Sequence, residues 1–431
     1  MSIQNSLQKR GLVSRIGFVS TRFAGTDGVS LEAAKWAEVL TKEGYECFWY
    51  AGLLEKENKE TYMCVPEAYF KHPENEWINE RIWGKTRRSE LVTRRIHNLA
   101  EYLKHTIYDF VKEFDLDLLI IQNALTIPMH LPLGLAITEF LSETVMPAIA
   151  HHHDFYWERS RFQVNCVPDF LDMAFPPRDV YLQHVVINQS AREELALRKG
   201  VSSILIPNVI NFHKPPEPPD EYAADIRQEI GLEPGDKLIL QPTRVVPRKG
   251  IEHSINLLQR LKDPKCKLIV SHPAGDEGSE YQYQLMKLAE SVGVDIRFFG
   301  DRVNYKRHRN CYGKKIYVLS DIYQQADLVI YPSIYEGFGN ALLESFYYKV
   351  PIIVNRYPVW MRDIEPKGFK VPVMEGFITE YVLEEAKKLL YDASYRQEIT
   401  EYNYNLAARY YSYTILRYGL NTLIQNIYHQ V

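Results

Sequence analysis

Cysteine is scarce in this sequence, and its placement excludes two kinds of small fold. An odd number of scattered cysteines predicts neither a disulfide framework nor a zinc knuckle. We therefore expect reduced thiols that serve mostly as packing residues. The five cysteines lie far apart and form no Cys-x-x-Cys pair: Cys47, Cys64, Cys166, Cys266 and Cys311.

Long apolar runs are missing as well. The apolar run at residues 118–121 is only four residues long and follows two acids, and residues 131–141 are interrupted by polar side chains. No segment reaches the roughly 18 apolar residues that a bilayer-spanning helix needs. Residues 1–15 lack the apolar core of a secretory signal. The sequence predicts a cytoplasmic protein without a transmembrane segment, for which peripheral membrane contact stays open.

An excess of positive charge is also lacking. The chain has 51 Lys plus Arg against 55 Asp plus Glu, a net charge of −4 over 431 residues. Because a nucleic-acid binder normally carries a basic domain or stripe, we expect no nucleic-acid partner. Apolar residues, by contrast, make up 46% of the chain, which is ample for two independent cores at this length.

The chain alternates short β-branched runs with amphipathic stretches, the pattern of parallel strands joined by helices. A first series predicts a helix that ends at Gly44, a long helical region over 80–114, and strands at residues 15–20, 45–50, 118–122, 147–151 and 185–188. A second series follows a proline cluster within 207–219, with strands at residues 237–241, 267–271, 296–299, 328–331 and 351–355. The Tyr-rich end, 402–428, is expected to be helical.

These patterns predict an α/β protein with two doubly wound parallel-sheet domains. We place an N-terminal domain at 1–208, a C-terminal domain at 209–410, and a last helix at 411–431 that returns to the first domain. Open α/β sheets bind ligands outside the carboxyl ends of their strands. The chemistry is therefore expected there, in a cleft between the domains.

The most informative segment is residues 331–344, a strand, a loop with two glycines and a helix that begins near Asn340. Glycines let the backbone approach a ligand, and the free amides of a helix start favour an anion. Glu336 would lie in this loop, and Glu344 one or two turns into the helix could accept from two ligand hydroxyls. The alternative is that Glu344 is a surface residue and the glycines merely turn the chain.

A basic turn follows the first strand of the second series. Arg244 and Lys249 are five residues apart with Pro247 between them, next to a helix start. Two such cations suit a diphosphate whose negative charge grows as a bond to it breaks. An isolated basic turn would more often be solvated, but the Glu336 segment in the same half favours a ligand site.

Together these motifs resemble glycosyltransferase family 4, retaining enzymes with the GT-B fold of two Rossmann-like domains facing a cleft. The strongest match is the Glu-x7-Glu segment with its Gly-Phe-Gly loop. The others occur in the family's order: a glycine loop before Val29, the strand and helix start at 185–190, Ile206-Pro207-Asn208 and the Arg244/Lys249 turn. The resemblance covers nearly the whole chain.

The resemblance implies roles for these residues. Arg244 and Lys249 would hold the donor diphosphate and Glu344 the donor ribose, and Gly28 would leave room for the donor phosphate. Glu336 would bind the transferred sugar, helped by the backbone of its neighbours Phe338, Gly339, Asn340 and Ala341. The donor would be GDP-mannose or UDP-glucose, and the leaving diphosphate would take the acceptor's proton. No tightly bound cofactor and no metal are then expected.

Residues 151–157 follow a predicted strand of the first domain. The family has a His-Asp pair here, so the resemblance makes His153 a contact of the donor sugar that Asp154 orients. Three adjacent histidines suit a metal poorly, because neighbours on an extended chain point apart. They could instead be hydrogen-bonded strand-end residues. Tyr156 and Trp157 could face an acceptor sugar ring or belong to the core.

Two basic stretches remain, 81–95 and 306–309. Either could bind a phosphorylated acceptor or an anionic membrane surface, although charge runs are often only solvated faces. Acceptors in the family bind mainly through the N-terminal domain, so Arg87 and Arg88 are the better acceptor candidates. The chain departs from the family at Val209 and Asn211, in the loop 355–360, which lacks the Gly-x-Pro-Glu pattern, and in an insertion at 305–315.

The sequence therefore predicts a retaining hexosyltransferase. It would move glucose or mannose from a nucleotide sugar to a small, hydrophilic, possibly phosphorylated acceptor such as a sugar or sugar-acid phosphate. A sugar-nucleotide epimerase on the same architecture is one alternative. A noncatalytic nucleotide-binding partner subunit is another.

Overall fold

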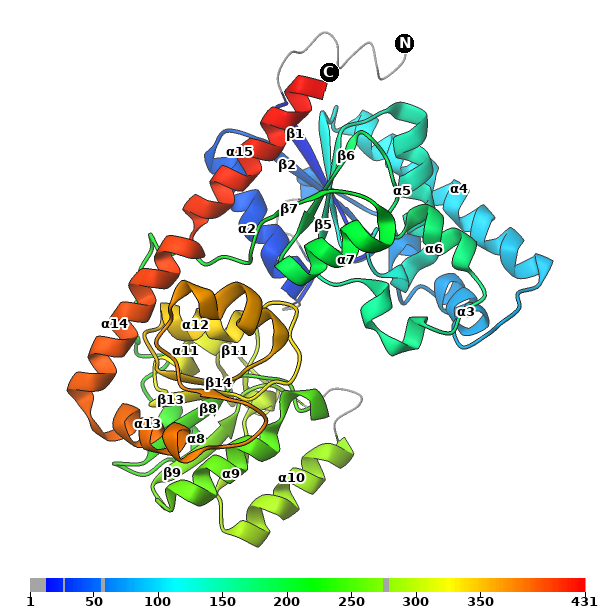
Figure 1. Ribbon diagram of the computed structural model, residues 1–431. Coiled ribbons are helices and arrows are strands. Elements are labelled where there is room, and N and C mark those ends of the chain that lie inside the picture. The colour runs from blue at the N-terminus through cyan, green and yellow to red at the C-terminus, as the bar shows by residue number, and fades with distance from the viewer. Residues whose placement is uncertain (1–12, 26–27, 56–58, 274–278, 431) are drawn as a thin grey trace. The chain divides into compact units, whose positions relative to one another are not determined.

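The computed structural model describes residues 13–25, 28–55, 59–273 and 279–430. The chain divides into two compact units (Figure 1). The first unit comprises the chain up to Pro207 and again from Thr414 onward. The second unit is Asn208–Tyr413.

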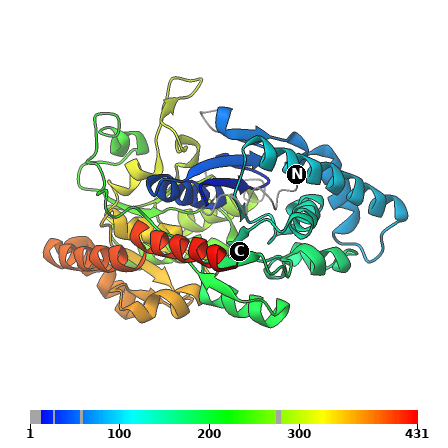
Figure 2. The ribbon, with the colours of Figure 1, turned by 90° about the horizontal axis from the view of Figure 1, so that it is seen from above.

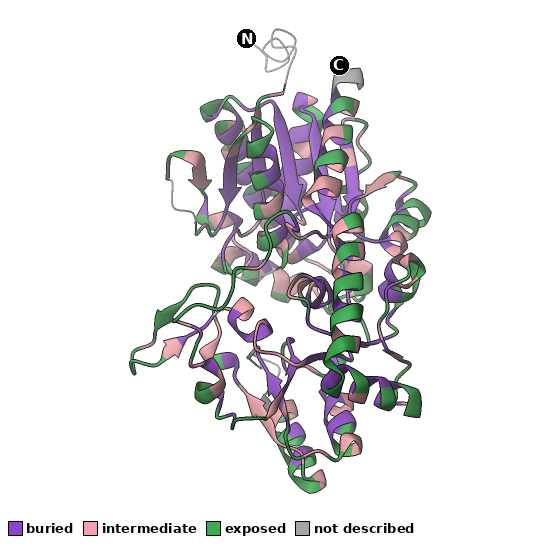
Figure 3. Ribbon diagram, turned by 90° about the vertical axis from the view of Figure 1, so that its left-hand side faces the viewer, coloured by how far each residue is buried: buried purple, intermediate pink, exposed green. Residues whose placement is uncertain are grey.

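The first unit is built on a seven-stranded parallel sheet in the order β3-β2-β1-β4-β5-β6-β7. Parallel strands covered on both faces read as continuous apolar runs, and every residue of the central strand β4 is buried (Figure 3). The strands are β1 (Arg15–Val19), β2 (Glu46–Ala51), β3 (Tyr62–Cys64), β4 (Leu118–Gln122), β5 (Ala148–His152), β6 (Leu182–Val186) and β7 (Ser203–Leu205).

Helices cover both faces of this sheet (Figures 1 and 2). The long helix α4 lies against α5, and its Lys104 side chain reaches Glu139 and Glu143 of α5 at 3.1 and 2.7 Å. The helices are α2 (Gly28–Lys42), α3 (Pro73–Ile82), α4 (Glu90–Glu113), α5 (Leu131–Thr144), α6 (Pro168–Ala174), α7 (Gln189–Lys199) and α15 (Tyr413–Gln430).

The predicted helical region over 80–114 is helical from Glu90 to Glu113 but is interrupted between Ile82 and Glu90. Helix α3 ends at Ile82, and the chain then turns at Gly84, whose φ is +69°. Helix α4 starts anew because the Ser89 hydroxyl accepts from the backbone N–H of Val92. Glycine in the left-handed region and a serine N-cap are the ordinary stop and start of helices.

The second unit has a six-stranded parallel sheet in the order β10-β9-β8-β13-β14-β15. Its strands are β8 (Lys237–Gln241), β9 (Cys266–Val270), β10 (Ile296–Phe298), β13 (Leu328–Tyr331), β14 (Ile352–Asn355) and β15 (Val373–Met374). Its helices are α8 (Ile226–Ile230), α9 (Ile251–Leu261), α10 (Ser279–Val292), α11 (Leu319–Tyr323), α12 (Asn340–Tyr347), α13 (Glu380–Tyr391) and α14 (Ala393–Tyr410). This order makes the loops after β8, β13 and β14 neighbours.

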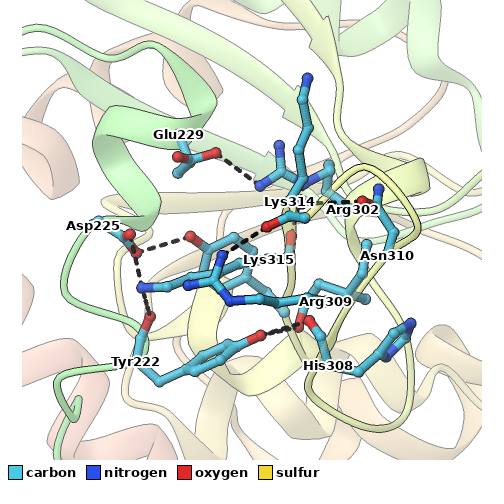
Figure 4. Close-up of polar contacts among 12 residues, drawn as sticks. Tyr222, Asp225, Glu229, Arg302, His308, Arg309, Asn310, Lys314 and Lys315 are labelled. Atoms are coloured by element: carbon cyan, nitrogen blue, oxygen red, sulfur yellow. Dashed lines mark hydrogen bonds and ion pairs between the residues drawn. The ribbon is translucent and has the colours of Figure 1, made fainter.

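The insertion after β10 is a small hairpin of β11 (His308–Arg309) and β12 (Lys315–Ile316). Figure 4 shows how its base is fastened to the segment before β8. Lys315 pairs with Asp225 at 2.7 Å, and the Tyr222 hydroxyl donates to the carbonyl of His308 at 2.8 Å. Arg307 of the predicted basic stretch pairs with Asp220 and with buried Asp321, so these two carboxylates neutralise its charge.

The Tyr-rich C-terminal segment consists of two helices. Helix α14 ends at Tyr410, and α15 begins at Tyr413. Between them Ser412 forms a β-bridge with Ile210, both in the second unit. Helix α15 packs within the first unit, where its Leu423 carbonyl accepts from the Gln183 side chain at 2.8 Å.

Candidate active site

The β13–α12 loop, residues 332–339, forms the centre of the candidate site. Helix α12 begins at Asn340, as the sequence predicts. Gly339 before it has φ +111°, and a Cβ there would lie 2.4 Å from the Tyr357 hydroxyl oxygen. Only glycine fits both the backbone angle and the space. The glycine therefore lets the chain turn sharply and present the first amides of α12.

Lys249 and Glu336 form a buried ion pair in this loop region. The Lys249 ammonium contacts Glu336 Oε1, and only 9% and 11% of the two side chains are exposed. Burial lowers the pKa of Lys249, while the Glu336 carboxylate opposes that shift. The predicted diphosphate cation and the predicted sugar-binding carboxylate thus lie in direct contact.

Positive charge gathers around this pair. Arg244 is exposed, and its charge and that of Arg248 act on Lys249 to lower its pKa further. His272, just after β9, lies half-buried near Lys249 and Arg244. Its partial burial first, and then these two positive charges, lower the pKa of His272 to about 4. The imidazole therefore stays neutral at neutral pH. The sequence reasoning missed His272, although its place after a strand was a usable signal.

The start of α12 offers backbone donors. The Asn340 side chain accepts from Asn208 Nδ2 at 2.7 Å, which fixes the first residue of the helix. The first amides of any helix have no partner within the helix, so oxygen atoms of a ligand can accept from them. Ala341 and Phe338 are buried on either side of this start.

Glu344 lies half-buried on α12 beside two stacked tyrosines. The rings of Tyr323 and Tyr348 are 5.3 Å apart, and both hydroxyl pKa values rise through burial and the nearby Glu344 carboxylate. Tyr331 continues the cluster, because burial, Glu336 and Tyr323 raise its pKa well above the usual range. The structure thus joins the surroundings of Glu344 to those of Glu336 through buried tyrosines.

In the first unit His153 follows β5, and Gln122 and Asn123 at the end of β4 contact it. The backbone N–H of His153 donates to Asn123 Oδ1 at 3.2 Å, and its Nε2 lies 3.4 Å from Gln122 Oε1. The Asp154 carboxylate accepts from Arg159, with the Nε bond at 2.7 Å. Sequence reasoning missed Gln122, which is fully buried at a strand end.

The other two histidines of the run are buried hydrogen-bonded residues. His151 stacks on Trp36 at 4.2 Å and bonds to Gln122 Oε1 at 3.0 Å. His152 bonds to Thr126 at 2.6 Å and to His184 at 2.9 Å. Within the described ranges no cluster of three or more His, Cys, Asp or Glu side chains could hold a metal ion.

Tyr156 and Trp157 pack into the first unit. Trp157 stacks on Phe155 at 4.4 Å, and Phe155 is fully buried in a cluster with residues of β6 and α7. Tyr156 packs against the main core of the unit. The structure thus gives both rings a packing role, which was one of the two alternatives for them.

The basic stretch 81–95 is mostly paired. Arg88 binds the Asp169 carboxylate with both terminal nitrogens and donates to the Cys166 carbonyl at 2.9 Å, so its guanidinium is engaged in the fold. Arg87 is exposed before α4. Gly28 is the first residue of α2, directly after residues 26–27, which lie outside the described part. The other arginines of the stretch each have an acidic partner: Arg81 with Glu80, Arg94 with Glu90, and Arg95 with Glu74.

Among the described residues, no helix is both long and apolar enough to cross a membrane. A family model described as "Glycosyl transferases group 1" matches residues 223–406. Mannosylglucosylglycerate synthase of Thermotoga maritima is 31% identical over 434 residues, covering 92% of this chain and 96% of that protein. The enzyme of the same name from Petrotoga mobilis is 31% identical over 391 residues, 85% and 87% of the two chains.

Solved structures share the architecture. A glycosyltransferase from Rickettsia africae superposes with a TM-score of 0.67 at 13% identity, over 96% of this chain and 98% of that one. A sucrose-phosphate synthase from Thermosynechococcus elongatus superposes with a TM-score of 0.66 at 14% identity, over 97% and 100%. At these identities the likeness shows the fold, which is GT-B.

Proposed function

The chain belongs to the glycosyl transferases group 1 family and transfers a sugar from a nucleotide donor, and on this premise we propose that it is a retaining mannosyltransferase that uses GDP-mannose. The observation that carries the proposal is the buried Lys249–Glu336 pair beside the start of α12. In this pair, a cation that can bind a diphosphate lies in contact with a carboxylate that can bind sugar hydroxyls. The choice of mannose is supported by the two relatives named mannosylglucosylglycerate synthase.

The proposed reaction needs no protein nucleophile. The bond between the sugar's anomeric carbon and the donor phosphate oxygen breaks, and the acceptor hydroxyl oxygen bonds to that carbon on the same face. The acceptor proton passes to the departing phosphate oxygen, and the nucleoside diphosphate leaves. Lys249, Arg244 and the amides of residues 339–341 stabilise the charge that grows on the phosphate. Glu344 binds the donor ribose.

We propose a small sugar acid, glucosylglycerate or its phosphorylated form, as the acceptor. The relatives' names support such an anionic acceptor. The first unit would bind it, with His153 and Asp154 near the transferred sugar and the exposed Arg87 available to an anionic group. UDP-glucose is the competing donor and is tested in the same experiment.

A donor and acceptor screen tests the proposal. At about 100 times its dissociation constant, the correct nucleotide sugar should stabilise the protein by roughly 2.7 kcal/mol in a thermal shift assay. We expect GDP-mannose to give this shift and, with glucosylglycerate, to release GDP and an α-mannoside. Failure of every nucleotide sugar to bind would contradict a transferase. A converted donor sugar without release of nucleotide would indicate an epimerase instead.

Chelation is expected to leave most of the activity. Side-chain cations and helix amides can neutralise the leaving diphosphate without a metal ion, and His272 beside them is neutral rather than a further charge. The measurement compares initial rates in excess EDTA with rates in added Mg²⁺ or Mn²⁺. Complete loss of turnover in EDTA, restored by one of the metals, would show that the cations do not suffice.

A further inference from the structure

The loop after β14 lies against the β13–α12 loop and touches it at both ends. β14 is the neighbour of β13 in the sheet, so the two loops leave the same edge side by side. Asn355, the last residue of β14, contacts the start of the β13–α12 loop, and Tyr357 contacts its end. The segment 355–360 is also where the chain departs from its family's usual Gly-x-Pro-Glu pattern.

Asn355 fixes the entry of the loop. Its Nδ2 donates to the carbonyl of Ser333 at 3.2 Å, and its Oδ1 accepts from the N–H of Gly376 at 2.9 Å. Asn355 and Ser333 are both buried. Because both ends of the amide have partners, the side chain has one orientation. The carbonyl of Ser333 is therefore linked, through Asn355, to the backbone just after β15.

Tyr357 fixes the exit of the loop. Its hydroxyl donates to the carbonyl of Phe338 at 3.0 Å, and the side chain is buried. Burial, and then the nearby Glu336 carboxylate, raises the pKa of Tyr357 well above the usual range, so the phenol keeps its proton. The same hydroxyl occupies the space where a side chain at Gly339 would begin.

The other side of the loop is held by the basic turn. The N–H of Ile334 donates to the carbonyl of Arg248 at 2.9 Å, one residue from Lys249. Without contacts on the β14 side, a loop with two glycines would lose its shape easily, because glycine has the largest backbone entropy to lose on ordering. Glu336 lies between the two points held by Asn355 and Tyr357.

We propose that Asn355 and Tyr357 are positioning residues, a two-point clamp that holds Glu336 and the amides of Gly339 and Asn340 in the geometry that binds the donor. The inference rests on the proposed role of this loop in donor binding. The clamp residues touch the loop backbone and need not touch the substrate.

The first test is Tyr357→Phe, with Tyr404→Phe as its matched control. Tyr404 also donates one hydrogen bond to a backbone carbonyl of the second unit, that of Phe212 at 3.3 Å, away from the loop. Both variants should lower the melting temperature slightly. Only Tyr357→Phe should raise KM for the nucleotide sugar and lower kcat/KM, by about five- to tenfold for one lost hydrogen bond. Equal kinetics in the two variants would overturn the proposal.

The second test is a double-mutant cycle with Gly339→Ala. A Cβ at Gly339 would lie 2.4 Å from the Tyr357 hydroxyl oxygen but 3.3 Å from the ring carbon that carries it. Removing the hydroxyl should therefore relieve part of the damage, so the double variant Gly339→Ala/Tyr357→Phe should turn over faster than Gly339→Ala alone. Additive losses would show that the hydroxyl and the glycine are not coupled.

Calorimetry with GDP and UDP separates this proposal from the proposed function. If the wild type neither binds a nucleotide nor turns over, the transferase proposal fails. If the wild type is active and Tyr357→Phe keeps the wild-type KM and affinity, only the clamp fails. Asn355→Ala should weaken nucleotide binding in the same direction as Tyr357→Phe, and an unchanged affinity in both variants would overturn the clamp.

Discussion

Replacing Lys249 with methionine is expected to lower kcat/KM about a hundredfold or more and to destabilise the second unit. The ammonium is proposed to bind the leaving diphosphate, and losing one charge-assisted contact alone costs roughly 1.5–3 kcal/mol, a ten- to hundredfold fall. The substitution also leaves the Glu336 carboxylate buried without its cation. Breaking a buried pair on one side costs about 3–5 kcal/mol of folding free energy.

The double variant Lys249→Met/Glu336→Gln separates the two effects. With both charges gone, no charge is left buried, so most of the free energy of unfolding should return. Activity should not return, because neither the proposed diphosphate cation nor the proposed sugar-binding carboxylate is present. Urea unfolding and steady-state kinetics on the two single variants and the double variant give the comparison. A double variant that regains turnover would contradict the proposed roles of both residues.

Arg307→Met is the control for the stability loss. Arg307 pairs with Asp321, which is 1% exposed, so this variant also leaves a buried carboxylate of the second unit without its cation. Because the guanidinium is engaged by Asp321 and Asp220 at the inserted hairpin, we expect reduced stability with nearly normal turnover. A parallel collapse of activity in Arg307→Met would mean that the Lys249 result reflects unfolding alone.

The sequence predicted the central strands well because buried parallel strands carry their signal locally. The runs at β1, β4, β8 and β13 are short and apolar, and the observed strands agree with the predicted ranges within one residue. For β6 the predicted range, 185–188, starts three residues after the observed strand and wrongly includes Asn188. Its side chain instead accepts from the N–H of Ala191 at 2.7 Å and caps α7. Edge strands such as β15, two residues long, are too short to show a period.

The site was predictable only where its residues are close in the sequence. Glu336, the glycines and the start of α12 belong to one segment, so the loop and helix could be placed from residue types alone. Tyr357 contacts Phe338, and within the first unit Gln122 contacts His153, because neighbouring strands bring separate loops together. A single sequence does not show that pairing. Arg88 had the right chemistry for an acceptor contact, but Asp169, 81 residues further along, engages its guanidinium.

Acidification should unfold the first unit at a pH at which the second unit is still folded. Burial holds the pKa values of His130 and His184 at about 4, and those of His151 and His152 lie well below the usual value. In the unfolded chain each histidine titrates near 6.5. Between these values the unfolded state binds more protons than the native state, so the free energy of unfolding falls as the pH falls.

The expected fall in the free energy of unfolding is large because four histidines act in the same direction. Each histidine that stays neutral in the native state lowers the free energy of unfolding by roughly 1 kcal/mol between pH 7 and 5.5, so together they remove several kcal/mol, a large part of the stability of a typical domain. In the second unit, a single half-buried histidine, His272, contributes an effect of the same sign. Urea titrations at several pH values should therefore show an early transition that moves strongly with pH and a later one that moves little.

His130→Asn identifies the histidines as the cause. His130 Nδ1 accepts from the N–H of Leu133 at 3.1 Å and caps α5, a role that asparagine can also fill. The variant removes one of the four titrating groups, so the slope of unfolding free energy against pH should fall by about a quarter even if the stability at pH 7 is lower. If these rings are buried in the neutral form, they take up protons on unfolding, and the free energy of unfolding must fall as the pH falls. A wild-type free energy of unfolding that stays constant from pH 7 to 5.5 would therefore contradict their neutral burial.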